Sequence, residues 1–126
     1  ITPNLKEINA VLPDPIRNED APVEQAAHDV MKRFHLGSII VTRSEAGLSL
    51  ICEGEIKHIP TKAQEVFDVS GAGDTVIAVF AMGIAGGIAP VASAYLANLA
   101  AGVVVAKLGT YAVSREELLK ALEKEK

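Results

Sequence analysis

The sequence predicts an α/β fold in which helices and strands alternate around one sheet. Residues 22–36 carry apolar side chains at helical spacing and are followed directly by the β-branched run SIIVT at 38–42. Two short strand patterns surround Gly54, and a glycine-rich turn at 71–73 leads into a long apolar stretch. A helix that feeds into a buried strand is typical of an αβ unit, and the hairpin adds antiparallel strands, so we expect a mixed sheet.

Composition indicates one soluble domain. The 126 residues are 49% hydrophobic and 22% charged, which is enough to close a core. The net charge of −4 and the absence of a Lys/Arg cluster argue against nucleic-acid binding. One cysteine, Cys52, cannot form an internal disulfide and fits a reducing compartment, so we expect a cytoplasmic location.

Residues 76–106 contain no charged residue and are long enough to span a bilayer, so a membrane hairpin is the alternative. Gly86, Gly87 and Pro90 interrupt the run, and its alanines and glycines gain little in hydrocarbon. We therefore expect no membrane span. The chain begins at Ile1 without a charged leader or an initiator methionine, and we expect it to be a piece of a longer protein.

The N-terminal third predicts two helices. Asn4, with Glu7 three residues later, is a capping-box pattern that starts a short helix over 4–11. After a polar, proline-rich loop, a second helix begins at Pro22 and ends at Gly37. Its apolar residues recur at helical spacing: Val23, Ala26, Ala27, Val30, Met31 and Phe34.

Three strands follow. SIIVT shows no polar alternation, as expected for a strand covered on both faces in a parallel sheet. Residues 48–52 and 55–59 predict two antiparallel strands joined by a tight turn at Gly54, at the edge of the sheet.

The C-terminal half predicts helices throughout. Residues 74–85 and 90–107 are nearly uncharged and apolar in every direction, so we expect both helices to be buried on most faces. Ser114 and Glu117 form a second capping box, which starts an amphipathic surface helix that closes the chain.

The turn at residues 71–73 is suited to an anion. Gly71 and Gly73 lack Cβ atoms, so the backbone can adopt positive φ and let an anion approach its N–H groups. These groups begin a helix, whose unpaired donors and dipole favour phosphate. Asp74 would be repelled by a bound phosphoryl group unless it served to accept a proton from an attacking hydroxyl. The turn therefore points to phosphoryl transfer.

A plainer interpretation is also open. Asp74 can be an acidic residue that complements the helix dipole, and Gly-x-Gly-Asp is by itself a weak motif. The sequence has no G-x-x-x-x-G-K-[ST], and position 76 is Val where G-x-G-x-x-G needs a third glycine. The histidines show no metal-ligand spacing, and we expect surface or packing roles for His28, His35 and His58.

DVSGAGDT at 68–75 resembles the D-T-x-G-A-G-D signature of the ribokinase-like, pfkB-type carbohydrate kinases. Three further segments resemble that family in the same order: TPNLKE at 2–7, VTRSEAG at 41–47 and ANLAAGVVVAKLGT at 97–110. Within the family they are most similar to the kinase domain of bifunctional heptose 7-phosphate kinases and heptose 1-phosphate adenylyltransferases. The resemblance implies a three-layer α/β/α fold with a mostly parallel sheet and an antiparallel edge hairpin. Residues 1–126 would be its C-terminal, nucleotide-binding and catalytic portion.

The resemblance also implies the catalytic residues. Asp74 would take the proton from the sugar hydroxyl, and the Gly71, Ala72 and Gly73 amides would form an anion hole for the γ-phosphoryl group of ATP. Asp68 would lie near the sugar or a monovalent-cation loop, although hydrogen bonding within the turn explains it almost as well.

Metal and nucleotide residues are implied in the same way. Asn4 and Glu7 would orient Mg²⁺ and its waters, with the plain helix cap as the alternative. Thr42, Ser44 and Gly47 would border the nucleotide, and many relatives have glycine in place of Ser44. Asn98, Ala101 and Gly102 would line the adenine pocket, and tight helix packing explains Ala101 equally well.

The implied reaction is ATP-dependent phosphorylation of a sugar hydroxyl, converting heptose 7-phosphate to heptose 1,7-bisphosphate on the route to ADP-heptose and lipopolysaccharide. Another sugar or nucleoside acceptor, such as fructose or ribose, is one alternative, and a non-catalytic nucleotide-binding fragment is another. In this family the N-terminal half supplies most sugar contacts and the lid. Without them we expect the chain alone to be weakly active or inactive, because the acceptor is not positioned and water is not excluded. Exposed apolar surface leaves a homo-oligomer open.

Overall fold

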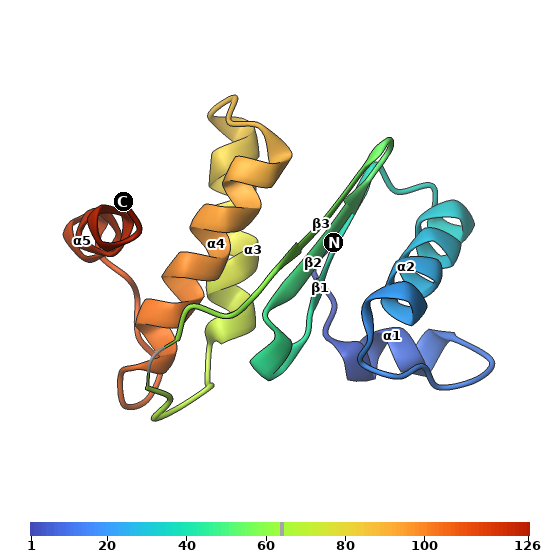
Figure 1. Ribbon diagram of the computed structural model, residues 1–126, viewed down its shortest axis with the longest axis horizontal. Helices are drawn as coiled ribbons and strands as arrows, with labels where there is room; N and C mark the ends of the chain where they lie inside the picture. Colours follow the sequence, from blue (N-terminus) through green and yellow to red (C-terminus); the bar gives the residue numbers. More distant parts are fainter. Residues whose placement is uncertain (64) are drawn as a thin grey trace. The chain divides into compact units, whose positions relative to one another are not determined.

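The computed structural model describes residues 1–63 and 65–126, which form two compact units, Ile1–Pro60 and Thr61–Lys126. The first unit packs two helices on one side of a sheet (Figure 1). Its elements are α1 (Leu5–Val11), α2 (Asp20–Phe34), β1 (Ser38–Thr42), the 3₁₀ turn η1 (Ser44–Ala46), β2 (Leu48–Cys52) and β3 (Glu55–Ile59).

The helix boundaries follow local capping chemistry. Asn4 and Glu7 form the predicted capping box at the start of α1, with both hydrogen bonds present. Helix α2 begins at Asp20 rather than at Pro22, because proline is tolerated in a first turn, where its missing N–H would have no partner. The helix also ends before the predicted Gly37. His35 adopts the left-handed conformation, with φ 53° and ψ 47°, and donates its N–H to the Met31 carbonyl oxygen.

The sheet has the order β1-β2-β3, and the predicted hairpin is confirmed. β2 pairs antiparallel with both neighbours, and Gly54 has φ 77° in the tight turn between β2 and β3. On the other edge of β1, Asn4 forms a parallel bridge with Thr42, flanked by hydrogen bonds from Ile40 and Thr42 to residues 1 and 3. The three-stranded sheet is therefore antiparallel, and among the described residues parallel pairing is limited to this isolated bridge, in place of the mostly parallel sheet that the sequence predicts.

Both faces of β1 and β2 are buried, as the unbroken apolar pattern of SIIVT predicts for β1, whereas β3 is exposed over most of its length. One face contributes Ile39, Val41 and Ile51 to a core that α1 and α2 share. On the opposite face, Ile40 and Leu50 are fully buried as well. Phe34 is 50% exposed at the end of α2, so the predicted apolar stripe of this helix is buried only as far as Met31.

The second unit is helical, and its elements are α3 (Ala72–Ala85), α4 (Pro90–Val105) and α5 (Arg115–Lys124). Helices α3 and α4 lie side by side as a hairpin, and α5 packs on α4 (Figure 1). At the crossing of α3 and α4, a Cβ on Gly83 would lie 2.8 Å from the Ser93 Cβ, so only glycine permits this approach.

Helix α3 is less buried than its composition predicts. Its buried residues, Val76, Val79 and Gly83, are three to four positions apart and form a single stripe. Ile77 and Met82 are exposed by 46% and 66%. An apolar residue on every face therefore does not mean that every face is covered in this unit. Among the helices in the described part of the chain, none combines the length and hydropathy needed to cross a membrane.

Candidate active site

The N-terminus of α3 is the predicted anion site. Gly71 is the N-cap, with φ 79° and ψ 0°, so the structure confirms the positive φ expected there. Gly73 is already helical and does not have positive φ, because the helix begins at Ala72. Its lack of a Cβ instead leaves open space, since no heavy atom lies within 4 Å of the position a Cβ would take.

Three main-chain N–H groups at this helix end lack a hydrogen-bond partner among residues 1–63 and 65–126, those of Gly71, Gly73 and Asp74. The N–H of Ala72 differs from the prediction, because it donates to the Val69 carbonyl oxygen at 3.2 Å within the turn. An anion here could be contacted by the three free groups, while Ala72 would first have to release Val69.

Asp74 lies in the first turn of α3 and is exposed. Its carboxylate has no hydrogen bond or ion pair within the part of the chain that the structure describes. An unpartnered carboxylate next to free N–H groups is available to accept a proton from a bound alcohol. The chemistry that the sequence predicts is therefore sterically open in this unit.

Asp68 has a clear role inside the turn. Its Oδ1 accepts the Ser70 N–H at 2.8 Å, and its Oδ2 accepts the Gly109 N–H at 3.1 Å. Hydrogen bonds from the Ser70 hydroxyl and N–H, together with the Gly109 N–H, hold the pKa of Asp68 below its ordinary value. Oδ1 therefore closes the turn on Ser70, and Oδ2 connects the turn to the loop after α4, so hydrogen bonding within the unit accounts for this residue.

The predicted metal residues are engaged with each other. Asn4 Oδ1 accepts the Glu7 N–H, and Glu7 Oε2 accepts the Asn4 N–H, each at 2.8 Å. The second oxygen of Glu7 remains available on an exposed side chain. No cluster of three or more His, Cys, Asp or Glu side chains suited to a metal occurs in residues 1–63 and 65–126.

The residues predicted to border the nucleotide lie in and beside one turn of the first unit. Thr42 ends β1, Ser44 is the first residue of the 3₁₀ turn with φ 53°, and Gly47 follows the turn with φ 83°. Gly47 has ψ −126°, a conformation that in effect only glycine adopts. This conformation by itself accounts for glycine at position 47, and the close backbone approach of a nucleotide stays a prediction.

The adenine-pocket residues all lie on α4. Asn98 is buried and has a partner within the protein, and Ala101 is partly exposed. A Cβ on Gly102 would lie 3.4 Å from the Ala63 nitrogen, so the main chain of residues 62–63 passes directly over this glycine. Close packing of that segment is thus one reason for glycine at position 102.

Sequence reasoning missed a polar network around one buried arginine. We call it the Arg43 network, and its members are Asn18, Asp20, Glu24, Arg43, Ser49 and His58. His58, expected to have no more than a surface or packing role, bridges Ser49 and Glu24. The available signal was a polar residue on the inward face of each hairpin strand, Ser49 in β2 and His58 in β3, directly paired in register.

The predicted site residues divide between the two units. The first unit holds the residues assigned to metal and to the nucleotide-side turn, Asn4, Glu7, Thr42, Ser44 and Gly47. The second unit holds the residues assigned to phosphoryl transfer and adenine, Asp68, Gly71, Ala72, Gly73, Asp74, Asn98, Ala101 and Gly102.

Comparison with known proteins identifies the family. The model of the pfkB family of carbohydrate kinases matches residues 1–117. A protein of Trichlorobacter lovleyi named bifunctional protein HldE is 51% identical over 99% of this chain, and one of the same name from Vibrio cholerae is 48% identical over 97%. The chain spans 26% and 25% of these relatives, about a quarter of their length.

Solved structures agree with the family match. A ribokinase from Thermotoga maritima superposes with a TM-score of 0.85 at 28% identity, over 97% of this chain and 41% of that one. Phosphofructokinase-2 from Escherichia coli gives a TM-score of 0.87 at 16% identity, over 98% of this chain and 39% of that one, and shows the same fold. The ribokinase-like α/β fold predicted from the sequence is thereby confirmed. From its match to the family model over residues 1–117 and its identity to these relatives, the chain belongs to the pfkB family of carbohydrate kinases.

Proposed function

We propose that residues 1–126 are the C-terminal, nucleotide-binding and catalytic portion of a sugar kinase domain that transfers the γ-phosphoryl group of ATP to a sugar hydroxyl. The observation that carries this proposal is the N-terminus of α3, where the free N–H groups of Gly71 and Gly73 lie beside the unpartnered carboxylate of Asp74. Among the structural relatives, a ribokinase from Arabidopsis thaliana was solved with ribose and ATP, and its fold matches this chain with a TM-score of 0.85.

In the proposed mechanism each group at this helix end has one task. The amides of Gly71 and Gly73 donate to the oxygens of the transferring phosphoryl group, where negative charge accumulates, and the helix dipole adds to this stabilisation. Asp74 accepts the proton of the attacking hydroxyl. The Ala72 N–H joins the anion hole only if its bond to Val69 opens, so we assign the main anion contacts to the two glycines.

Mg²⁺ fits the residues present at the level of donor chemistry. This cation is commonly held by one or two carboxylates together with substrate phosphates, and Glu7 retains one oxygen outside its capping bond. When bound, the ion would neutralise phosphate charge. Glu7, oriented by Asn4, would hold it through water. A monovalent cation near Asp68 remains part of the proposal, although both oxygens of Asp68 already accept hydrogen bonds.

Heptose 7-phosphate is the acceptor we propose, giving heptose 1,7-bisphosphate for ADP-heptose and lipopolysaccharide synthesis. The four sequence segments described above imply it, and the relatives named bifunctional protein HldE support it. We place the reaction in the cytoplasm, which suits the single free thiol of Cys52.

The test is Asp74→Asn in the complete protein that contains this chain. We expect kcat to fall about 10²- to 10⁴-fold, the range for losing a general base, while calorimetry shows unchanged MgATP binding. Glu116→Gln is the matched control, because Glu116 is also an exposed acid in the first turn of a helix, α5, whose dipole it favours. The control should retain the kcat of the unsubstituted protein. Equal turnover in Asp74→Asn would remove this residue from the mechanism.

Two further outcomes would redirect the proposal. Sugar-dependent ADP release with ribose, fructose or a nucleoside, but not with heptose 7-phosphate, would keep the chemistry and change the acceptor. MgATP binding without sugar-dependent ADP release from any acceptor would identify a non-catalytic nucleotide-binding module instead.

A further inference from the structure

Arg43 is a buried cation at the base of the turn that follows β1. Only 4% of the residue is exposed, and its Nε and Nη1 atoms both donate hydrogen bonds to polar side chains. Nε donates to Asn18 Oδ1 at 2.8 Å, and Nη1 donates to Asp20 Oδ1 at 2.6 Å and to Ser49 Oγ at 2.9 Å. The Arg43 guanidinium also holds the pKa of Asp20 below its ordinary value. Because a buried charge is stable only when paired and hydrogen-bonded, this side chain has essentially one place to lie.

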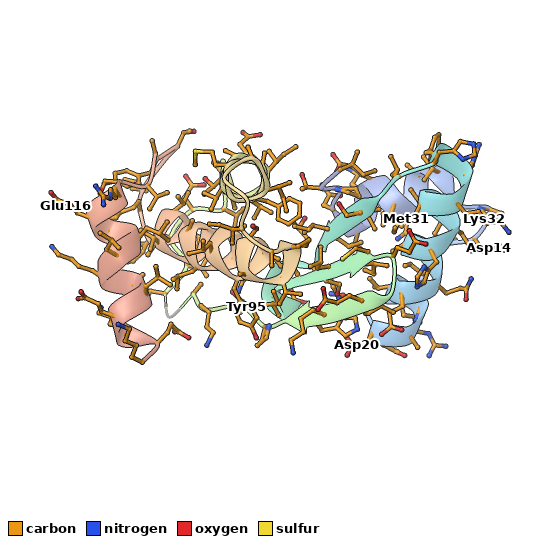
Figure 2. All side chains as sticks on the ribbon, turned by 90° about the horizontal axis from the view of Figure 1, so that it is seen from above. Asp14, Asp20, Met31, Lys32, Tyr95 and Glu116 are labelled. Carbon is orange, nitrogen blue, oxygen red and sulfur yellow. The ribbon has the colours of Figure 1, made fainter. Side chains whose placement is uncertain are left out.

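The network continues through the hairpin to α2. Ser49 Oγ lies 2.7 Å from His58 Nδ1, and His58 Nε2 lies 2.7 Å from Glu24 Oε1. A neutral His58 that carries its proton on Nε2 satisfies both contacts, with the Ser49 hydroxyl donating to Nδ1. Hydrogen bonds from α2, β2 and β3 therefore hold Arg43 directly or through a neighbour in the network. Figure 2 labels Asp20, which belongs to the first turn of α2.

Serine, histidine and glutamate in this order resemble a nucleophilic triad, but the geometry excludes that role. Ser49 is fully buried, and its oxygen already accepts a hydrogen bond from Arg43. No substrate carbonyl or phosphoryl group could reach it without unfolding the hairpin. The network must therefore act on the structure around it rather than on a substrate.

What surrounds Arg43 is a turn held in an unfavourable conformation. Ser44 has φ 53°, which is uncommon for a residue with a side chain, and such positions persist only when neighbouring contacts enforce them. Within the turn, the Arg43 N–H donates to the Gly47 carbonyl oxygen at 2.8 Å, and the Ala46 N–H donates to the Arg43 carbonyl oxygen at 3.1 Å.

Asn18 links the network to this turn. Its Oδ1 accepts from the Arg43 side chain, while its Nδ2 donates to the Arg43 carbonyl oxygen at 3.2 Å. The Asn18 side chain, in the loop before α2, thus hydrogen-bonds to both the guanidinium and the carbonyl oxygen of Arg43, which precedes Ser44. The contact spans 25 residues of sequence and fixes the peptide at which the chain enters the positive-φ conformation.

We propose that the Arg43 network, acting through Asn18, is a positioning device that holds residues 43–47 in the conformation that binds the nucleotide. This inference rests on the proposed function, because it takes Thr42, Ser44 and Gly47 as the nucleotide border. A turn that already has its binding conformation loses no conformational entropy when ATP binds. Loosening the turn should therefore weaken ATP binding without changing the contacts to the transferred phosphoryl group.

The experiment substitutes Asn18, which is outside the turn and outside the proposed catalytic and binding residues. In the complete protein, Asn18→Ala should raise the Kd for MgATP about fivefold, the effect of losing roughly one net hydrogen bond, and should leave kcat within about twofold. Hydrogen exchange should accelerate at the Ala46 and Gly47 amides, which are bonded within the turn.

Asn9→Ala is the matched control. Asn9 Oδ1 accepts the Ile16 N–H at 3.0 Å, so the same kind of side chain holds a residue of the same loop without contacting Arg43 or the turn. It should lower stability by a similar amount and leave both the MgATP Kd and turn exchange unchanged. If Asn9→Ala and Asn18→Ala raise the Kd in proportion to their loss of stability, the network is structural and the proposal fails.

A second variant separates positioning from general loosening. Glycine adopts φ 53° without strain, so the Asn18→Ala penalty on MgATP binding should shrink to less than about twofold when measured in a Ser44→Gly background. An undiminished penalty in that background would overturn the inference. Unchanged exchange at Ala46 and Gly47 in Asn18→Ala would also overturn it, whatever the nucleotide result. Failure of the unsubstituted protein to bind MgATP would instead contradict the proposed function.

Discussion

The two glycines at the N-terminus of α3 allow activity and stability to be separated within one turn. Gly73 has a helical conformation, and a Cβ added there meets no heavy atom within 4 Å. Alanine in a helix is more stable than glycine by about 0.5–1 kcal/mol, so Gly73→Ala should stabilise the protein by up to that amount. The same methyl group would stand where the proposed phosphoryl group approaches the free N–H, so kcat should fall about tenfold or more.

Gly71→Ala should behave differently. Its added Cβ would lie 3.5 Å from Thr110 Cγ2, an ordinary contact, so steric overlap contributes little. The residue has φ 79°, however, and forcing alanine into this conformation costs about 1–2 kcal/mol. We therefore expect Gly71→Ala to lose both stability and activity.

Urea denaturation and steady-state ADP release, measured on both variants of the complete protein, check this pair of predictions. The informative result is a Gly73→Ala protein that is at least as stable as the unsubstituted one and clearly slower. Full activity in a folded Gly73→Ala protein would show that no anion approaches this N–H during turnover. A loss of stability in that variant would show that the space beside Gly73 is filled in the complete protein.

Two further predictions concern stability. Gly83→Ala should destabilise the α3–α4 hairpin by about 1–3 kcal/mol in thermal or urea unfolding, because its Cβ would overlap Ser93 Oγ. Gly37→Ala is the control and should not lower stability, because its Cβ meets no heavy atom within 4 Å. Equal stability of the two variants would contradict the close helix crossing. Hydrogen bonding from the Ser114 N–H, and then from Lys107 and Tyr111, lowers the pKa of Glu117 from 4.5 to about 2, so its stabilising contribution is complete above about pH 4.5 and disappears as the pH falls toward about 2. Glu117→Gln should therefore lower the free energy of unfolding at neutral pH, and this loss should shrink as the pH falls from about 4.5 toward 2. Glu116→Gln, at a neighbouring exposed position labelled in Figure 2, should show no such pH dependence. A loss in Glu117→Gln that stays constant with pH would refute the lowered pKa of Glu117.

Features of the fold that depend on neighbours in sequence could be predicted closely. Both capping boxes, Asn4 with Glu7 and Ser114 with Glu117, form as the spacing indicates. The hairpin about Gly54 has the predicted strand bounds. In each case the interacting groups are a few residues apart, so local stereochemistry decides the outcome.

Errors arose where two local solutions compete. His35 and Gly37 could both end α2, and the structure uses His35 because its left-handed conformation lets the N–H reach Met31. Gly71 and Gly73 could both supply positive φ, but the helix begins between them, so only Gly71 does. The sequence thus indicated the right kind of residue at each position, but it did not decide which of the two candidates takes the role.

By itself the sequence determined the family, the order of the elements and the glycine-rich helix start with its neighbouring carboxylate, because those depend on short motifs and residue periodicity. Only the tertiary structure decided that the Ala72 N–H is already bonded to Val69, that α3 is buried along one stripe, and that Arg43 lies buried among partners 6 to 25 residues away. The physical reason is that a buried guanidinium is satisfied by whichever side chains folding brings to it, and those distances in sequence carry no periodic signal.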